Sequence, residues 1–310
     1  MTMDNTGGAT RRKVLQCMAW GSAGVLWTVA GGIPRAHALD QAGSEQLAQA
    51  STFSFVQVSD SHIGFHGDVN PTPDATLKEA FTQIGAMKNK PAFLIHTGDV
   101  SHLSKPVELD TAKEIVKTAG LETFYVPGEH DTIGDNGKAF FERFGRSKTA
   151  DGWYSFDHGG VHFVALVNVL NLQSGGGGNL GRDQLEWLEA DLKGKTASTP
   201  IVVLAHMPLW ALYPQWGWST DDGAQALGYM KRFGSVTVLN GHIHQIQQKI
   251  EGNVTFQTAQ STAFPQPAPG DGPGPGPMKV SADKLRSTLG IRNINFVAGK
   301  PSIKDASLMG

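Results

Sequence analysis

The segment FSFVQVSDSH, from Phe53 to His62, constrains the fold more than any other part of the sequence. Its apolar spacing from Phe53 to Val58 is typical of a buried strand. The pattern stops at Asp60 and His62. Residues two apart on an extended segment point to the same side, so both side chains can reach one metal ion. Because open α/β sheets bind ligands at the carboxyl ends of their strands, the segment predicts a metal site at a sheet edge. The same triplet also occurs in capped turns.

Four further strand-like runs end in residues that can bind metals. The added candidates are Asp99, Glu129, His206, His242 and His244. Glycine stands beside three of the motifs, where a backbone that turns sharply near an ion requires it: Gly98, Gly128 and Gly241. A lone histidine on a strand is more often a core residue than a ligand, but five motifs at five strand ends are not expected by coincidence. A catalytic ion takes about three or four protein ligands, so the set predicts two ions that share a carboxylate.

The order Asp-x-His, Gly-Asp, Gly-x-His-Asp, His and Gly-His-x-His, from Phe53 to Gln257, resembles the calcineurin-like metallophosphoesterases. The resemblance implies an α/β fold, a four-layer αββα sandwich of two mixed sheets flanked by helices, with the dinuclear site at the strand ends. It implies that the first metal binds Asp60, His62, Asp99 and His244, and that the second binds Asp99, Glu129, His206 and His242. It also implies hydrolysis of a small phosphomonoester or phosphodiester by attack of a metal-bound hydroxide. The mixed ligands suit two divalent or mixed-valence ions of Mn, Fe or Zn.

His130 and Asp131 follow the third motif directly. The resemblance implies that His130 contacts the substrate phosphate and protonates the leaving oxygen, with Asp131 holding its imidazole. The alternative is that the pair only caps the next helix. His102 stands where the purple acid phosphatase branch has a tyrosine, which argues against membership of that branch.

Glu129 departs from the family pattern, which has Asn at this position. A carboxylate adds a negative charge, so we expect tighter binding of the second metal and weaker attraction for an anionic phosphate. A second interpretation is that Glu129 turns away from a looser site. The rival function is a metal-retaining binding protein with weak or lost catalysis, although the intact His130-Asp131 pair argues against it. A further rival is an enzyme of the same fold whose substrate is not a phosphate ester.

An aromatic stretch, LWALYPQWGWST, follows His206. Four of its side chains are candidates for a substrate wall that stacks a base or receives an aryl or acyl group: Trp210, Tyr213, Trp216 and Trp218. The alternative is a lid that packs on the domain itself.

The first 38 residues resemble a twin-arginine export signal. Arg11 and Arg12 precede an apolar run from Cys17 to Ile33, and a small-x-small cleavage site ends at Ala38. The run contains four glycines and is a poor membrane anchor, so we expect no stable span in the mature chain. The sequence therefore predicts export by the twin-arginine machinery to the periplasm or the medium. Cys17 is the only cysteine, so the mature chain has no disulfide.

We expect residues 39–263 to form the catalytic domain, residues 264–277 a Pro/Gly-rich loop, and residues 278–310 an extension that packs on the same domain. Apolar spacing predicts helices over 72–88, 108–119 and 182–192. Removing the signal takes the basic residues from 26 to 22 and the acidic ones from 28 to 27, a formal charge of −5. This balance gives no basic face and argues against nucleic-acid binding.

Overall fold

A computed structural model describes residues 25–30, 33–38, 52–147, 151–173, 175–297 and 300–308. The chain divides into two compact units, Met1–Ala50 and Ser51–Gly310. In the first unit, the described strands β1 (Val25–Ala30) and β2 (Ile33–Ala38) pair as an antiparallel hairpin. Most of the predicted export signal lies outside the described residues. The second unit contains all seven predicted metal ligands.

One sheet of the second unit has five strands in the order β13-β12-β3-β4-β5. Its members are β3 (Phe53–Val58), β4 (Phe93–His96), β5 (Thr123–Tyr125), β12 (Gly290–Val297) and β13 (Lys300–Ser307). The first three are parallel, whereas β12 runs antiparallel to both β3 and β13. The C-terminal strands are therefore part of the sheet that carries the first motif.

The other sheet has six strands in the order β10-β11-β9-β8-β7-β6. Its members are β6 (Tyr154–His158), β7 (Val161–Ala165), β8 (Ile201–Leu204), β9 (Val236–Asn240), β10 (Gln248–Glu251) and β11 (Val254–Thr258). The four central strands are parallel neighbours, and the two edge strands β6 and β10 are antiparallel. Both sheets are thus mixed.

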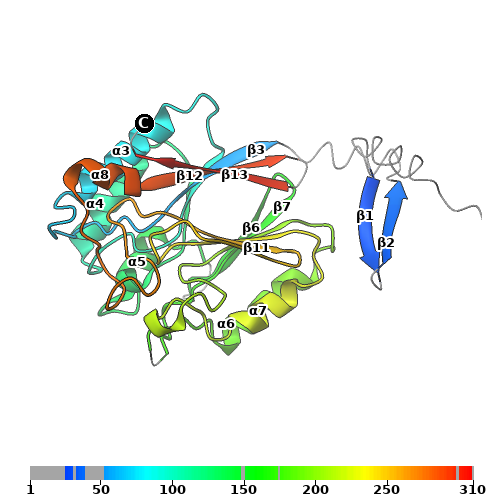
Figure 1. The fold of residues 1–310 in the computed structure, drawn as a ribbon. Helices are drawn as coiled ribbons and strands as arrows, with labels where there is room; N and C mark the ends of the chain where they lie inside the picture. The colour runs from blue at the N-terminus through cyan, green and yellow to red at the C-terminus, as the bar shows by residue number, and fades with distance from the viewer. Residues whose placement is uncertain are drawn as a thin grey trace, which may run out of the picture. The chain divides into compact units, whose positions relative to one another are not determined.

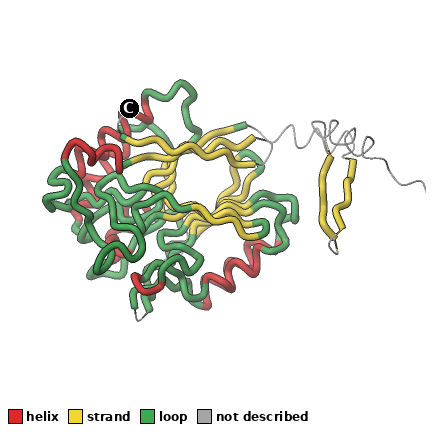
Figure 2. The backbone as a smooth tube through the Cα atoms, in the orientation of Figure 1, coloured by secondary structure: helices red, strands yellow, loops and turns green. Residues whose placement is uncertain are grey.

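Alternation along the strands separates an inner core from two outer ones. Phe55 of one sheet and Phe163 of the other belong to a single buried cluster between the sheets. The neighbouring residues Val56 and Val164 face outward, into clusters that include helix side chains. Figures 1 and 2 show the strands as two facing layers, with helices on their outer sides. The predicted four-layer αββα architecture is confirmed.

The helices of the described residues are α3 (Pro73–Gly85), α4 (Pro106–Lys117), α5 (Lys138–Phe144), α6 (Arg182–Lys193), α7 (Gly223–Met230) and α8 (Ala282–Thr288). Two short 3-10 turns, η1 (Glu129–Thr132) and η2 (Pro214–Trp216), lie in loops. The predicted helix over 108–119 instead begins at Pro106, because proline suits the first turn of a helix. Glu108 supports this start, since its Oε2 accepts a hydrogen bond of 2.7 Å from the amide of Leu103.

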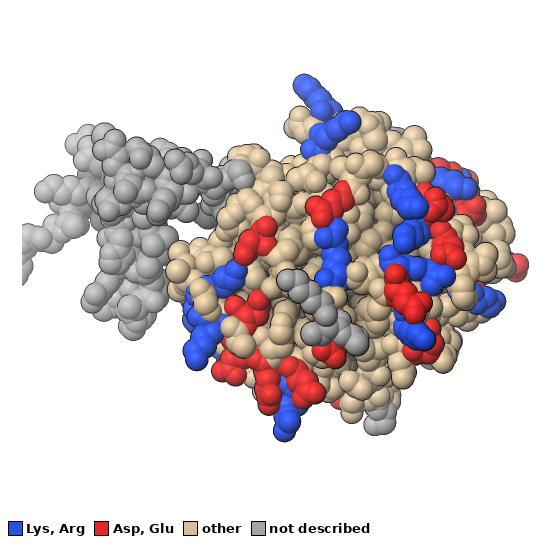
Figure 3. Space-filling view, turned by 180° about the vertical axis from the view of Figure 1, so that it is seen from behind, with Lys and Arg blue, Asp and Glu red and all other residues tan. Residues whose placement is uncertain are grey.

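Residues 264–277 contain no helix or strand, as their Pro and Gly content predicts. None of the helices among the described residues combines the length and apolar character needed to cross a bilayer. On the face in Figure 3, Lys and Arg side chains are interspersed with Asp and Glu.

Candidate metal centre

The five motifs meet at one edge of the sandwich because the strands that carry them are parallel within each sheet. In the five-stranded sheet, β3 is followed by Asp60 and His62, β4 by Asp99, and β5 by Glu129. In the six-stranded sheet, β8 is followed by His206, and β9 by His242 and His244. The structure brings all seven predicted ligands into overlapping groups whose ligand atoms lie within 4.8 Å of one another.

The first group consists of Asp60, His62 and His244, all buried. His244 Nε2 lies 3.4 Å from Asp60 Oδ1 and 3.2 Å from His62 Nε2. The three ligand atoms converge on one point, as they must to bind a single cation.

The second group consists of Glu129, His206 and His242. Glu129 Oε2 lies 2.8 Å from His206 Nε2, and its Oε1 lies 3.0 Å from His242 Nδ1. Glu129 thus points into the centre, and the interpretation in which it turns away is wrong for this structure.

Asp99 lies between the two groups. Its Oδ2 is 3.4 Å from His62 Nε2 and 3.5 Å from His206 Nε2. Its Oδ1 accepts a hydrogen bond of 3.0 Å from the amide of His130, which fixes the orientation of the carboxylate. One carboxylate oxygen therefore faces both groups, which is the arrangement that two ions sharing a ligand require.

Several polar atoms of the centre are buried without a hydrogen-bond partner. They are Asp60 Oδ2, Glu129 Oε2, His206 Nε2 and both ring nitrogens of His242. His206 Nε2 and Glu129 Oε2 are close in space but lack hydrogen-bond geometry. Buried polar atoms without partners are costly, and cations would satisfy these. The residues present fit a pair of metal ions.

Outer hydrogen bonds orient two of the histidines. His206 Nδ1 lies 2.7 Å from the carbonyl oxygen of Thr97, and His244 Nδ1 lies 2.6 Å from that of Phe264. A carbonyl oxygen only accepts, so each Nδ1 carries a proton, and Nε2 is the atom whose lone pair can face the centre once the ring is neutral.

The backbone of the centre adopts a conformation that residues other than glycine rarely adopt. Five of the seven predicted ligands have a positive φ: Asp60 (53°), His62 (41°), Asp99 (51°), His242 (69°) and His244 (55°). Such conformations cost free energy and cluster at functional sites. Gly128 is needed for a different reason, because a Cβ there would overlap the Asp99 carboxylate.

The charges within the second group stabilise one another. Burial opposes ionisation of Glu129, but His242 and His206 outweigh it and hold the pKa of Glu129 well below its usual range. Burial likewise opposes a charge on His206, yet Asp99 and Glu129 raise its pKa well above the usual value. A histidine must lose its proton to bind a metal through Nε2, so metal binding to this group depends on pH.

Residues 53–246 match the family model described as Calcineurin-like phosphoesterase. The chain belongs to this family. Membership agrees with the two ligand groups and with the αββα fold, and it supports the class of metal-dependent phosphoric ester hydrolases.

Relatives of this phosphoesterase have more than one activity in their names. A probable glycerophosphodiester phosphodiesterase of Arcobacter nitrofigilis is 27% identical over 164 residues, which cover 49% of this chain and 56% of the relative. A serine/threonine-protein phosphatase, CPPED1, of Danio rerio is 24% identical over 65% of this chain and 73% of its own length. The match thus spans little more than half of the Arcobacter protein.

Solved structures share the fold. A dimetal phosphatase from Danio rerio superposes with a TM-score of 0.56 at 14% identity, over 83% of this chain and 98% of that one. A purple acid phosphatase from yellow lupin gives 0.60 at 13% identity, over 83% of this chain and 52% of that one. At these identities the likeness extends to the fold alone.

The predicted role of Asp131 in this phosphoesterase is wrong. Its buried carboxylate accepts hydrogen bonds from the amides of Val100, Ser101 and Gly128, and from the Ser101 hydroxyl. His130 Nδ1 instead lies 2.6 Å from the carbonyl oxygen of His102. Burial and the nearby Asp99 raise the pKa of Asp131 to about 6. Asp131 organises the loops around the centre and does not hold the His130 imidazole.

The predicted substrate wall is wrong for two of its four aromatic residues. Trp218 is fully buried, and Trp210 packs on Phe256 in the outer core with ring centroids 4.8 Å apart. Tyr213 and Trp216 are partly exposed and contact each other edge to face at 5.3 Å. Trp210 and Trp218 instead follow the alternative interpretation, in which this stretch packs on the domain itself.

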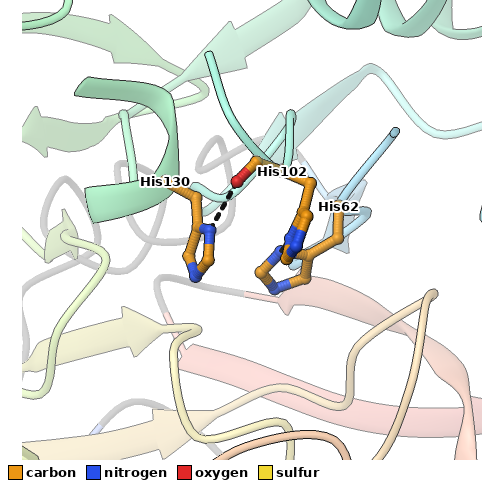
Figure 4. Close-up of side chains that lie close together, drawn as sticks. All are labelled: His62, His102 and His130. Carbon is orange, nitrogen blue, oxygen red and sulfur yellow. Dashed lines mark hydrogen bonds between the residues drawn. The ribbon is translucent and has the colours of Figure 1, made fainter. Parts of the chain in front are cut away.

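Sequence reasoning missed a role for His102. The structure places its ring beside those of His62 and His130, and the three form a further group of possible ligands (Figure 4). The available signal was its position three residues after Asp99, in the loop that follows the same strand.

Proposed function

We propose that this phosphoesterase hydrolyses a small phosphate ester, and that a phosphodiester is the substrate to test first. The observation that carries the proposal is the Asp99 carboxylate, one oxygen of which faces two groups of buried ligand atoms. A further relative, from Nostoc, 26% identical over 55% of this chain and 62% of its own length, is named a 3',5'-cyclic-nucleotide phosphodiesterase. Together with the Arcobacter relative, this favours a diester.

Asp60, His62, Asp99 and His244 would hold the first ion, and Asp99, Glu129, His206 and His242 the second. Two bound cations supply positive charge that polarises the phosphoryl oxygens and acidifies water. The chain orients His206 and His244 through the Thr97 and Phe264 carbonyls, and it buries all seven side chains except that of Glu129, which is partly exposed.

His130 would assist the leaving group. Its Nδ1 donates to the His102 carbonyl, so its Nε2 is the atom that can hold a proton and transfer it to the leaving oxygen. Burial disfavours the charged ring, but Asp99 and Glu129 outweigh burial and raise the pKa of His130.

The test is hydrolysis of bis-p-nitrophenyl phosphate and p-nitrophenyl phosphate by the full chain, loaded separately with Mn, Fe or Zn. We expect turnover of at least one ester, with a higher kcat/KM for the diester. A protein that binds two ions and hydrolyses neither ester contradicts the proposal. That outcome favours the rival function, a metal-retaining binding protein. The observation that supports this rival is the negative charge of Glu129.

We also propose export by the twin-arginine machinery to the periplasm or the medium, on the basis of Arg11, Arg12 and the cleavage site at Ala38. Replacing both arginines with lysine should keep the full-length protein in the cytoplasm, as measured by fractionation and mass spectrometry of the N-terminus. Cleavage after Ala38 in that double variant would argue against the twin-arginine route.

A further inference from the structure

His102 contacts two functional histidines at once. Its Nδ1 lies 3.4 Å from His62 Nδ1, and its ring stacks on that of His130, with centroids 4.9 Å apart and planes 18° apart. Its carbonyl oxygen lies 2.6 Å from His130 Nδ1, the contact drawn as a dashed line in Figure 4. The His62 and His102 rings meet edge to face, with centroids 5.5 Å apart.

The outer nitrogen of His62 differs from those of its neighbours. His206 and His244 direct Nδ1 to backbone carbonyls, at 2.7 and 2.6 Å. His62 also directs Nε2 inward, 3.4 Å from Asp99 Oδ2, so Nδ1 is its outer nitrogen. The partner found for that nitrogen is the ring of His102. A metal-binding histidine normally donates its outer N–H to an acceptor that fixes the ring.

We propose that His102 is a positioning residue, which accepts the Nδ1 proton of His62 and braces the ring of His130. The inference rests on the proposed metal centre and deepens it. Because His102 Nδ1 acts as the acceptor, its own proton lies on Nε2. The residue is well held for this task, since its amide donates to the Ile63 carbonyl at 2.9 Å and Phe65 contacts the ring edge to face at 5.2 Å.

Side-chain variants isolate this role, because the backbone carbonyl that anchors His130 persists in every one of them. His102→Leu fills a similar volume without an acceptor. His102→Asn keeps an oxygen at the position of Nδ1 and is the conservative variant. His66→Ala is the matched control, since His66 is an exposed histidine in the loop that follows the first motif.

The first measurement is metal affinity, obtained by titrating the metal-free proteins with Zn against a competing chelator. Loss of an outer partner typically costs 10- to 100-fold, so we expect His102→Leu to weaken one of the two sites by roughly that factor. His102→Asn should recover most of the affinity, and His66→Ala should match the wild type. Equal affinities in His102→Leu and the wild type would overturn the proposal, as would an equal loss in His102→Asn.

The second measurement is the proton NMR spectrum of the Co(II)-loaded proteins, in which the ring N–H of each bound histidine is a separate exchangeable signal. We expect the His62 signal to broaden by faster exchange in His102→Leu and to stay sharp in His102→Asn. An unchanged spectrum in His102→Leu contradicts the positioning role. Neither measurement requires turnover, so the proposal can fail while the protein hydrolyses esters, and it can hold in a protein that does not.

Discussion

Two clusters of histidine and carboxylate side chains in this molecule differ in whether their polar atoms have hydrogen-bond partners within the protein. One is the candidate metal centre. The other surrounds His162 on β7, whose Nδ1 lies 2.8 Å from Asp157 Oδ1 and whose Nε2 lies 2.7 Å from Asp191 Oδ2. Asp157 also pairs with Lys195, and Asp191 accepts from the Ser155 hydroxyl. Both ring nitrogens and both carboxylates therefore have partners within the protein.

The metal centre has the same residue types without those partners. His242 has neither ring nitrogen hydrogen-bonded, and Asp60 Oδ2 and His206 Nε2 are also unpaired. His162 lies within a regular strand, whereas Asp60 and His242 have a positive φ. Proximity of acid and imidazole is thus weak support for a metal site. Unpaired buried ligand atoms on a strained backbone are strong support, because a bound cation would complete them.

The most severe test of this contrast is Asp99→Asn. We expect loss of both metal binding and turnover by more than about a hundredfold, since losing a shared ligand should cost more than losing an outer partner. Metal content after dialysis and kcat/KM on bis-p-nitrophenyl phosphate measure the two effects. A variant with wild-type metal content and full activity would refute the shared role of Asp99.

Metal addition should stabilise the protein, because the ions bind the folded state. At a free metal concentration of 100 Kd each site contributes about 2.7 kcal/mol, which raises the Tm of a domain of this size by roughly 5 to 11 °C. Differential scanning fluorimetry with and without chelator measures the shift. The shift in Tm should be smaller in Asp99→Asn and unchanged in a variant at His162. Equal shifts in these two variants and the wild type would contradict the distinction between the two clusters.

His162→Leu should lower the free energy of unfolding by about 2 kcal/mol without changing metal content, because it leaves Asp191 Oδ2 without its histidine partner. Burial opposes ionisation of Asp191, but hydrogen bonds from His162 and Ser155 outweigh it and lower its pKa. A lowered pKa stabilises the fold above the unfolded value near 4, and the contribution is lost as the pH falls through the folded value.

Urea unfolding at pH 7 and pH 3 should therefore show a larger difference between His162→Leu and the wild type at pH 7. Loss of metal from this variant would show that the two clusters are coupled.

The fold and the convergence of the candidate ligands could be predicted because both depend on local sequence. Apolar runs followed by Asp, Glu or His mark strand ends, and parallel strands bring those ends to one edge. Asp131 could not be placed this way, since its partners Val100 and Ser101 come from a different loop. Trp218 could not either, because its burial depends on how a long loop folds back. The contact of His102 with His62 joins loops 40 residues apart. Sequence spacing thus located the candidate ligands that converge at the centre but not the groups that orient them.

Glu129→Asn has the smallest predicted effect on activity. It tests the role of a charged ligand within the metal centre itself. Glu129 lies between His206 and His242, and each of its oxygens faces one of them. Asn keeps one oxygen ligand and removes a negative charge close to where an anionic phosphate must bind. We expect kcat/KM to stay the same or to rise by up to about fivefold, the size of a charge interaction of roughly 1 kcal/mol in a solvated site.

Metal content should be retained, since six of the seven predicted ligands are untouched. The measurement is kcat/KM together with metal stoichiometry, with Glu129→Gln as the control that removes the charge at constant side-chain length. A loss of activity and metal by more than about a hundredfold in both variants would contradict this expectation. It would show that the second ion requires the negative charge of Glu129 in addition to His206 and His242.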